Sequence, residues 1–140
     1  MRKVFLFELN TDITNLIKNA IQNEFGDEVK HLSSLDESLK EISMGDYDLI
    51  IARDSFNNVN GNVKKFIDSI DTNHIESVVI SVGNVDIEHE QLLGQLPEKF
   101  NMSDLIQMMQ NYFSQNKLTD ETSYVEISLE VINLIEKTNF

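Results

Sequence analysis

Apolar residues follow two different periods along the first 115 or so residues of the chain. Short continuous apolar runs have the length and composition of buried β-strands. Between them, apolar residues recur every three or four positions, as on one face of a helix. Strands are predicted at Lys3–Phe7, Glu28–Leu32, Leu49–Ala52, Ser77–Val82 and Gln91–Leu96. Helices are predicted around the apolar stripes that span Ile13–Phe25, Leu35–Ile42, Val63–Ile70 and Leu105–Phe113.

Polar residues and glycines mark the ends of these helices. Thr11 or Asp12 is predicted to cap the first helix, Ser34 the second and Ser103 the last. Glycines at positions 26 and 45 are predicted to end the first two helices. Because strands alternate with helices, the chain is predicted to form a doubly wound α/β domain. Its five-stranded parallel sheet would be covered by helices on both faces.

The alternation of strands and helices is interrupted between Val82 and the last helix. About twenty residues, GNVDIEHEQLLGQLPEKFNM, would have to supply a helix, a strand and their turns. If Gln91–Leu96 is the fifth strand, only Gly83–Glu90 remains for the fourth helix, which is about two turns at most. We therefore predict that this helix is reduced to a turn or lost. The alternative is a helix over Asp86–Leu93 and no proper fifth strand.

The sequence changes character after Phe113. Ser114–Thr122 is polar and is predicted to be a linker, followed by a strand at Tyr124–Ile127 and a helix at Ser128–Lys137. The predicted organisation is therefore a domain of residues 1–115 and a strand-helix extension within 116–140. Apolar residues cover most of the surface of this last helix, so it is expected to need a packing partner. That partner could be the sheet of its own chain or a second copy, or the extension could open a further domain.

Composition and charge narrow the classes of function. The formal net charge of −13 disfavours direct binding of nucleic acid, because phosphate contacts need clustered Lys and Arg. Without cysteine, the chain has no disulfide, zinc–thiolate site or thiol nucleophile. No apolar run approaches the ~18 residues of a membrane span. The N-terminal MRKVFLFELN is interpreted as a first strand rather than a signal peptide. A cytoplasmic location without a membrane partner is expected.

The stretch Tyr47–Gly61, YDLIIARDSFNNVNG, joins a buried strand to a polar loop. Together with the first strand and turn, KVFLFELNTDI, and the order of elements, it resembles the receiver domain of bacterial response regulators over roughly residues 1–115. The resemblance implies a sheet with strand order 2-1-3-4-5. In that family an Asp lies five residues before the phospho-acceptor aspartate and a Gly eight residues after it. Here Asp48 and Gly61 place Arg53 at the acceptor position.

Aspartyl phosphorylation needs a carboxylate nucleophile, Mg²⁺ held by acidic side chains, and a Lys that pairs with the phosphoryl oxygens. This sequence departs from the family pattern at five places. Arginine occupies the acceptor position, and the acidic pair after the first strand is Glu8-Leu9. The sensing Thr or Ser is Val82, and the Lys position falls on Glu98, with Lys99 one residue late. The fifth departure is the reduced fourth helix. The comparison with the family therefore implies a pseudo-receiver that binds no metal and no cofactor.

Two hypotheses concern the acceptor position itself. Because the first and third strands are neighbours in this fold, we expect Arg53 to pair with Glu8, with Asp54 or Asp12 as further partners. The alternative is a solvated Arg53 without a steady partner. Asp54 could accept a phosphoryl group only if the third strand slipped by one residue, which would move every side chain to the other face of the sheet.

Other candidate residues carry weaker signals. His31, His74 and His89 are far apart and lack the spacing of metal ligands. The run Glu88-His89-Glu90 is interpreted as a solvated turn. No Gly-x-Ser-x-Gly, P-loop or dinucleotide pattern is present, so the sequence does not predict an enzyme.

The predicted function is that of a non-phosphorylated pseudo-receiver in bacterial signal transduction. It would act as a protein-interaction or dimerisation module at the N-terminus of a longer protein, with an output domain after residue 140. The alternatives are a phosphorylatable receiver that uses Asp54 and a small-ligand sensor that uses the pocket at the strand ends. The predicted interaction surface consists of apolar residues of the fifth strand, the last helix and the extension: Leu92, Leu93, Met108, Tyr112 and Ile132.

Overall fold

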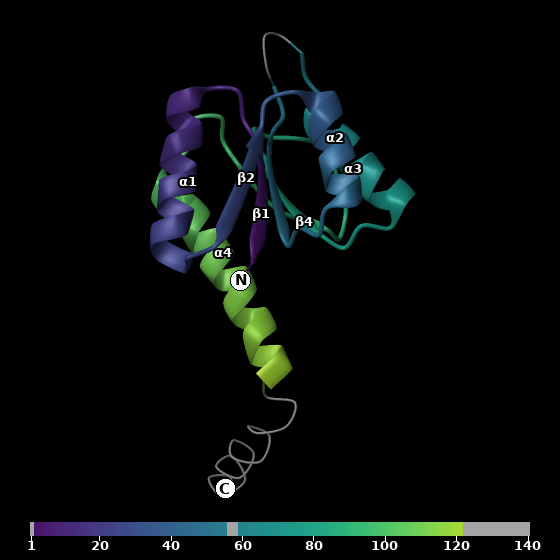
Figure 1. Cartoon of the computed structure of the whole chain (residues 1–140). Coiled ribbons are helices and arrows are strands. Elements are labelled where there is room, and N and C mark those ends of the chain that lie inside the picture. Colours follow the sequence, from purple (N-terminus) through teal and green to yellow (C-terminus); the bar gives the residue numbers. More distant parts are fainter. Residues whose placement is uncertain (1, 56–58, 122–140) are drawn as a thin grey trace, which may run out of the picture. The chain divides into compact units, whose positions relative to one another are not determined.

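The computed structural model describes residues 2–55 and 59–121, along which strands and helices alternate except between the last two strands (Figure 1). The strands are β1 (Lys3–Phe7), β2 (Glu28–Leu32), β3 (Leu49–Arg53), β4 (Val78–Val82) and β5 (Leu92–Leu96). The helices are α1 (Thr11–Phe25), α2 (Leu35–Met44), α3 (Asn62–Asn73) and α4 (Met102–Glu121). Each of the five strands predicted for the sheet is confirmed within one residue of its predicted start and end.

The strands form a parallel sheet in the order β2-β1-β3-β4-β5, which confirms the predicted fold class and strand order. Helix α1 lies on one face of the sheet, and α2 and α3 lie on the other (Figure 1). This order makes β1 and β3 neighbours in the sheet, although 41 residues, 8–48, lie between them in the sequence. Their carboxyl ends therefore meet at one edge of the sheet, where sites usually form in open parallel sheets.

The pleat of the strands divides their side chains between two layers. In register, Phe5 lies beside Ile50, and Ile50 lies beside Val79. These three side chains belong to one core cluster with Phe66 and Ile70 of α3. The first four residues of β3 are wholly buried, as expected for a central strand that is covered on both faces. The continuous apolar run in the sequence is thus explained by burial on two sides.

Helix ends agree with the sequence predictions at some positions and differ at others. Gly26 ends α1 with a φ of 70°, a left-handed conformation that glycine adopts without a steric penalty. Ser34 caps α2 as predicted. The prediction for α1 is wrong, because Asn10 is its N-cap and the Asn10 side chain accepts a hydrogen bond of 2.9 Å from the Ile13 amide. The cap prediction for α4 is also wrong, because the helix begins at Met102 and Ser103 lies inside its first turn.

The segment between β4 and β5 contains no helix, which confirms the predicted loss and contradicts the alternative helix over Asp86–Leu93. Burial instead alternates along it. Val85 and Ile87 pack against the core cluster, whereas Asp86 and Glu88 are exposed. A short stretch with this alternation covers the core through every second residue. It ends in a turn at Glu90 and Gln91, closed by a hydrogen bond of 3.0 Å from the Leu92 amide to the His89 carbonyl, and Glu88 and Glu90 are exposed there, which agrees with the predicted solvated turn.

The chain divides into two units, Met1–Ile106 and Gln107–Phe140. The first unit contains the sheet, α1 to α3 and the first turn of α4. Helix α4 continues to Glu121, so the described part of the predicted linker Ser114–Thr122 is helical. The predicted boundary after residue 115 stays a prediction, and the predicted strand and helix of the extension lie outside the described residues.

None of the described helices combines the length and apolar character that a membrane span requires.

Candidate functional site

Glu8 follows directly after β1, at the carboxyl edge of the sheet. Its side chain is almost wholly buried, with 1% of its surface exposed. One carboxylate oxygen, Oε1, accepts a hydrogen bond of 2.7 Å from Nε of Arg53. The other, Oε2, accepts the backbone amides of Leu9 at 2.9 Å and Asn10 at 3.0 Å. Three donors therefore share the negative charge of this carboxylate.

Arg53 is the last residue of β3, and its side chain is 11% exposed. It lies on the face of the sheet opposite to Ile50 and Ala52, because side chains alternate along a strand. Glu8 lies on the same side, one residue beyond Phe7, which is paired with Ala52 in register. The register therefore brings the two charges together, which confirms the predicted ion pair and contradicts the solvated alternative.

This ion pair has one donor without an acceptor. The Nη2 atom of Arg53 is shielded from solvent and has no hydrogen-bond partner among the described residues. Desolvating two charges cancels much of their attraction, so the ion pair itself is not expected to add much stability. Its main effect is to hold the ends of β1 and β3 in one arrangement.

Asp54 points toward the other layer and has a different role. Its Oδ1 accepts the amide of Val63 at 3.1 Å, and its Oδ2 accepts the amide of Gly61 at 3.4 Å. Because Gly61 provides no capping side chain, Asp54 supplies acceptors to the start of α3. The further pairings of Arg53 with Asp54 or Asp12, which we expected, do not occur among the salt bridges of the described residues.

The other residues that the family resemblance assigns to the phosphorylation site differ in how far they are exposed. Leu9 packs against the core cluster, and Val82 is buried beside Arg53 in the neighbouring strand. Glu98 and Lys99 are exposed. A side chain added at Gly83 would start 3.4 Å from Cβ of Asp54 and 4.0 Å from Cγ of Glu98, so these positions lie close together.

The receiver fold raises the question of a magnesium site at this edge. Magnesium prefers several oxygen ligands in octahedral geometry. Here the Glu8 carboxylate already accepts three hydrogen bonds, Leu9 offers no ligand atom, and the Arg53 cation lies where it would repel a metal ion. No group of three or more potential metal ligands occurs in the part of the chain that the structure describes. The residues present therefore do not fit the ion.

A hollow of about 320 Å³ opens beside the ion pair. It is lined by Glu8, Leu9, Asn10, Ile13 and Arg53, so apolar and charged side chains both border it. Asn10 and Ile13 were not predicted from the sequence to border this site. Asn10 could have been identified as a helix cap, because asparagine is among the preferred residues at that position.

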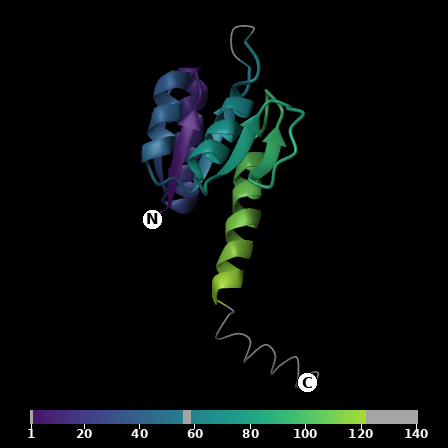
Figure 2. The same ribbon diagram turned by 90° about the vertical axis from the view of Figure 1, so that its right-hand side faces the viewer.

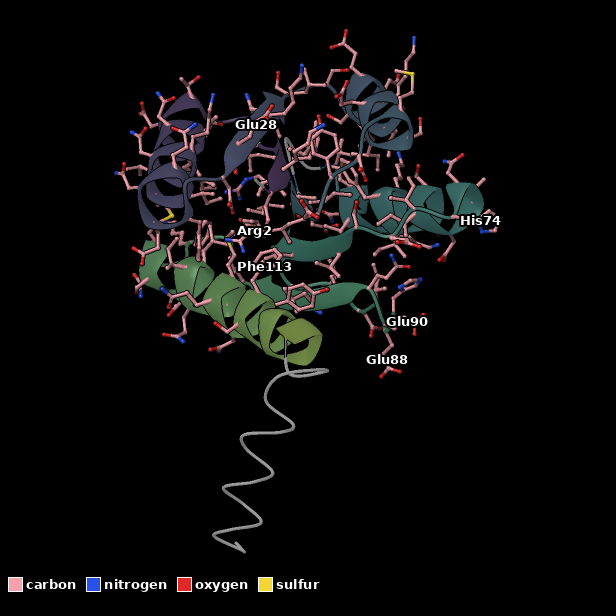
Figure 3. The ribbon with its side chains drawn as sticks, turned by 60° about the horizontal axis from the view of Figure 1, so that its bottom comes forward. Arg2, Glu28, His74, Glu88, Glu90 and Phe113 are labelled. Carbon is pink, nitrogen blue, oxygen red and sulfur yellow. The ribbon has the colours of Figure 1, made fainter. Side chains whose placement is uncertain are left out.

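The three histidines take part in separate contacts. Nε2 of His31 donates to the backbone carbonyl of Glu8 at 2.6 Å, next to the ion pair. His74 ends α3 in a left-handed conformation. Nε2 of His89 lies 2.8 Å from Oδ1 of Asp71, and its Nδ1 accepts the amide of Gln91. Glu88 and Glu90 flank His89 and point away from the ribbon (Figure 3). The contact of His31 with Glu8 results from the pairing of β1 with β2, and it was not predicted from the sequence.

The predicted interaction residues can be placed in part. β5 is an edge strand of the sheet (Figure 2), and its Leu92 and Leu93 are half-buried. Met108 and Tyr112 of α4 are also half-buried. Ile132 lies outside the described residues.

Comparisons with known proteins agree on the fold. No protein-family profile and no curated protein matches the sequence. The receiver domain of a protein described as a LuxO repressor from Vibrio parahaemolyticus matches with a TM-score of 0.69 and 23% identity, over 86% of this chain and 96% of that one.

Two further solved structures match the fold. The receiver domain of a sensor histidine kinase from Pseudomonas aeruginosa PAO1, with magnesium coordinated in its active-site cleft, matches with a TM-score of 0.63 and 13% identity. The match covers 81% of this chain and 98% of that one. The pseudo-receiver domain of the CikA protein matches with a TM-score of 0.58 and 11% identity, over 79% of this chain and 96% of that one. This protein therefore has the fold of the receiver domains of two-component signalling.

Proposed function

We propose that this chain is a pseudo-receiver that is not phosphorylated and that acts in bacterial signal transduction through contacts with another protein or a second copy of itself. The observation that carries the proposal is the buried ion pair between Arg53 and Glu8. By comparison with the family, this guanidinium stands at the acceptor position, and a guanidinium cannot take up a phosphoryl group as a carboxylate does. It also holds the carboxylate that would otherwise be free to bind a metal.

The surroundings of Asp54 support the same proposal. Both of its carboxylate oxygens accept backbone amides at the start of α3. Phosphorylation at Asp54 would have to break at least one of these hydrogen bonds in a residue that is only 7% exposed. The neighbouring positions supply neither a second acidic ligand nor a lysine in the place where the family has one.

The proposal assigns no catalytic step to this chain and places it in the cytoplasm. The apolar positions of β5, Leu92 and Leu93, and those of α4, Met108 and Tyr112, are proposed to contribute to a protein contact. An edge strand leaves backbone groups unpaired along its outer side, which supports β5 as a contact element. A further output domain after residue 140 remains part of the proposal.

Treatment with acetyl phosphate and Mg²⁺, followed by intact-mass spectrometry, tests the absence of phosphorylation. We expect no addition of a phosphoryl group to the wild-type chain, while an active receiver domain treated in parallel becomes labelled. Beryllofluoride with Mg²⁺ should likewise leave the amide resonances of Asp54 and Val82 unchanged. A phosphoryl group mapped to Asp54 would establish the alternative function.

The variant Arg53→Asp tests whether the other differences from the receiver-family pattern also prevent phosphorylation. Because Leu9, Val82 and Glu98 remain in place, we expect this variant to stay unlabelled as well. Labelling of Arg53→Asp would show that the arginine alone blocks phosphorylation, and that the rest of the site is still competent.

A further inference from the structure

The hollow beside the ion pair combines features that do not usually occur together in an unused surface depression. Its lining includes two apolar side chains, Leu9 and Ile13, and the charged pair of Arg53 and Glu8. Its volume of about 320 Å³ lies at the lower end of the range of small-molecule sites. An apolar wall with few polar groups opposite is the usual composition of such sites.

The polar side chains that line the hollow favour a ligand that accepts hydrogen bonds over one that donates them or carries a positive charge. Glu8 already accepts three hydrogen bonds, so its oxygens have little capacity left for a ligand. Arg53 uses Nε for Glu8, and its Nη2 makes no hydrogen bond with the described residues. A buried donor without a partner carries a cost of about 1–3 kcal/mol. Because Nη2 is shielded from solvent, an acceptor oxygen of a ligand would relieve this cost once the guanidinium turns toward the hollow that Arg53 borders.

The charges around the hollow and on the whole chain restrict the charge that such a ligand can carry. The guanidinium is one source of positive potential, and the N-terminus of α1, which borders the hollow through Asn10 and Ile13, is a second. Glu8 offsets most of the guanidinium charge, and the whole chain carries −13, so a dianion such as phosphate is disfavoured. A monoanion with an apolar chain matches both features, because its charged group can accept a hydrogen bond from Arg53 and its chain can pack against Leu9 and Ile13.

We propose that this hollow binds a small monocarboxylate with an apolar chain, with its carboxylate at Arg53 and its apolar part against Leu9 and Ile13. The inference rests on the proposed function, since it requires Arg53 to hold the acceptor position permanently. Binding there would connect the level of a small metabolite to the ends of β1 and β3. The receiver fold would then respond to a ligand in the place where a phosphorylated relative responds to its phosphoryl group.

Titration with hexanoate, followed by two-dimensional ¹H–¹⁵N NMR, tests the inference. We expect saturable shifts at the amides of Leu9 and Asn10 and at the Nε–H of Arg53. The neutral analogue hexanamide should bind about tenfold or more weakly, because hydrogen bonds to a charged acceptor are the stronger ones. Inorganic phosphate should produce no saturable shift at these positions.

Two variants with the same substitution provide the matched control. Ile13→Glu adds a negative charge to the wall of the hollow and should weaken hexanoate binding about tenfold or more, by repulsion of the ligand carboxylate. Leu16→Glu adds the same charge to the same helix at a residue that is 59% exposed, and it should leave the affinity unchanged. Arg53→Lys, which keeps the charge but loses the planar donors, should also weaken binding.

The inference is overturned if hexanoate causes no saturable shift at the three positions, if hexanamide binds equally well, or if the two glutamate variants behave alike. These failures differ from failure of the proposed function. A chain that ignores hexanoate and also resists acetyl phosphate is still a pseudo-receiver without this ligand. A chain that is labelled by acetyl phosphate refutes the pseudo-receiver itself.

Discussion

A single guanidinium at the end of β3 determines what the carboxyl edge of this sheet can hold. Under the proposed function, Arg53 stands in the place of the phospho-acceptor, and its ion pair with Glu8 occupies a carboxylate that would otherwise be free to bind a metal ion. Both effects follow from one hydrogen bond of 2.7 Å between two nearly buried side chains. Because breaking such a pair leaves a buried charge without a partner, removing either residue alone is costly. In the proposed function, the arginine therefore permanently replaces the phosphorylation chemistry of the receiver fold.

Tyr47 shows how burial changes a single titratable group. Its side chain packs edge-on against Phe5, and its hydroxyl donates to a carboxylate oxygen of Glu41 at 2.6 Å. Burial raises the pKa of the Tyr47 hydroxyl well above its ordinary value of 10.0, and the hydrogen bond and charge of Glu41 raise this pKa further. The charge of Glu28 acts in the same direction.

This raised pKa predicts a pH dependence of stability. Above about pH 10 the unfolded chain loses the Tyr47 proton while the folded chain keeps it, so the free energy of unfolding falls as the pH rises. In the variant Tyr47→Phe this contribution is absent, and stability should decline less steeply between pH 9 and pH 11, which brackets the ordinary pKa of about 10. Urea unfolding of both proteins across this range measures the difference. Parallel declines would show that Tyr47 does not titrate differently in the folded state.

At the scale of secondary-structure elements, the connection from β4 to β5 departs most from the expected alternation. The segment Asn84–Glu90 places Val85 and Ile87 against the core and exposes its acidic residues, Asp86, Glu88 and Glu90. Gln91 then donates to the backbone carbonyls of Ile75 and Ser77, which holds the start of β5 to the loop before β4. A segment anchored in this way has fixed contacts on the core side, although it lacks the backbone hydrogen bonds of a helix.

Helix α3 depends on a residue outside it. Because the carboxylate of Asp54 accepts two amides at its start, Asp54→Ala should lower the free energy of unfolding by about 1–3 kcal/mol. Asp54→Asn keeps one acceptor oxygen and should have a smaller effect. Asp68→Ala, which removes an exposed carboxylate of α3 from its pair with Lys64, should cost about 0.5 kcal/mol or less. Urea unfolding gives the free energies, and amide hydrogen exchange at Val63 locates the effect.

If Asp54→Ala proves as mild as Asp68→Ala, the carboxylate does not anchor the helix. It would then be available for other chemistry, and the phosphorylatable alternative would gain support.

For the whole molecule, charge and surface act in opposite directions on association. A net charge of −13 opposes contact between two copies, while the apolar residues of the edge strand β5 favour it. Since salt screens the repulsion between like charges, any association should strengthen as ionic strength rises.

Size-exclusion chromatography with light scattering tests self-association. We expect a dimer fraction that grows with protein concentration and with salt. Leu93→Glu, which places a charge on β5, should shift the chain to a monomer, whereas Leu16→Glu on the exposed face of α1 should not. A wild-type chain that stays monomeric at high concentration and high salt contradicts the dimer part of the proposal and leaves a different protein as the partner.

The sequence was sufficient for the features that depend on local spacing. The apolar runs and stripes indicated the strands and helices. By resemblance to the receiver family, the spacing of Asp48 and Gly61 predicts Arg53 at the acceptor position, and this assignment stays a prediction. The order of strands then implied that Arg53 and Glu8 are neighbours. The predicted strands and helices and the pairing of Arg53 with Glu8 are confirmed. The strands and helices could be predicted because burial on one or both faces imposes a period that can be recognised within a few residues.

Contacts between distant parts of the chain required the tertiary structure. The sequence did not show that Asp54 binds the start of α3, that His31 contacts the carbonyl of Glu8, or that α4 continues through the polar residues after Phe113. Each of these depends on which groups meet in space and on the backbone donors they find there, and a polar side chain has no period that reveals its partner. Pattern in the sequence thus determined the layers and the residue at the strand end. Only the packing of those layers decided which hydrogen bonds each charged group makes.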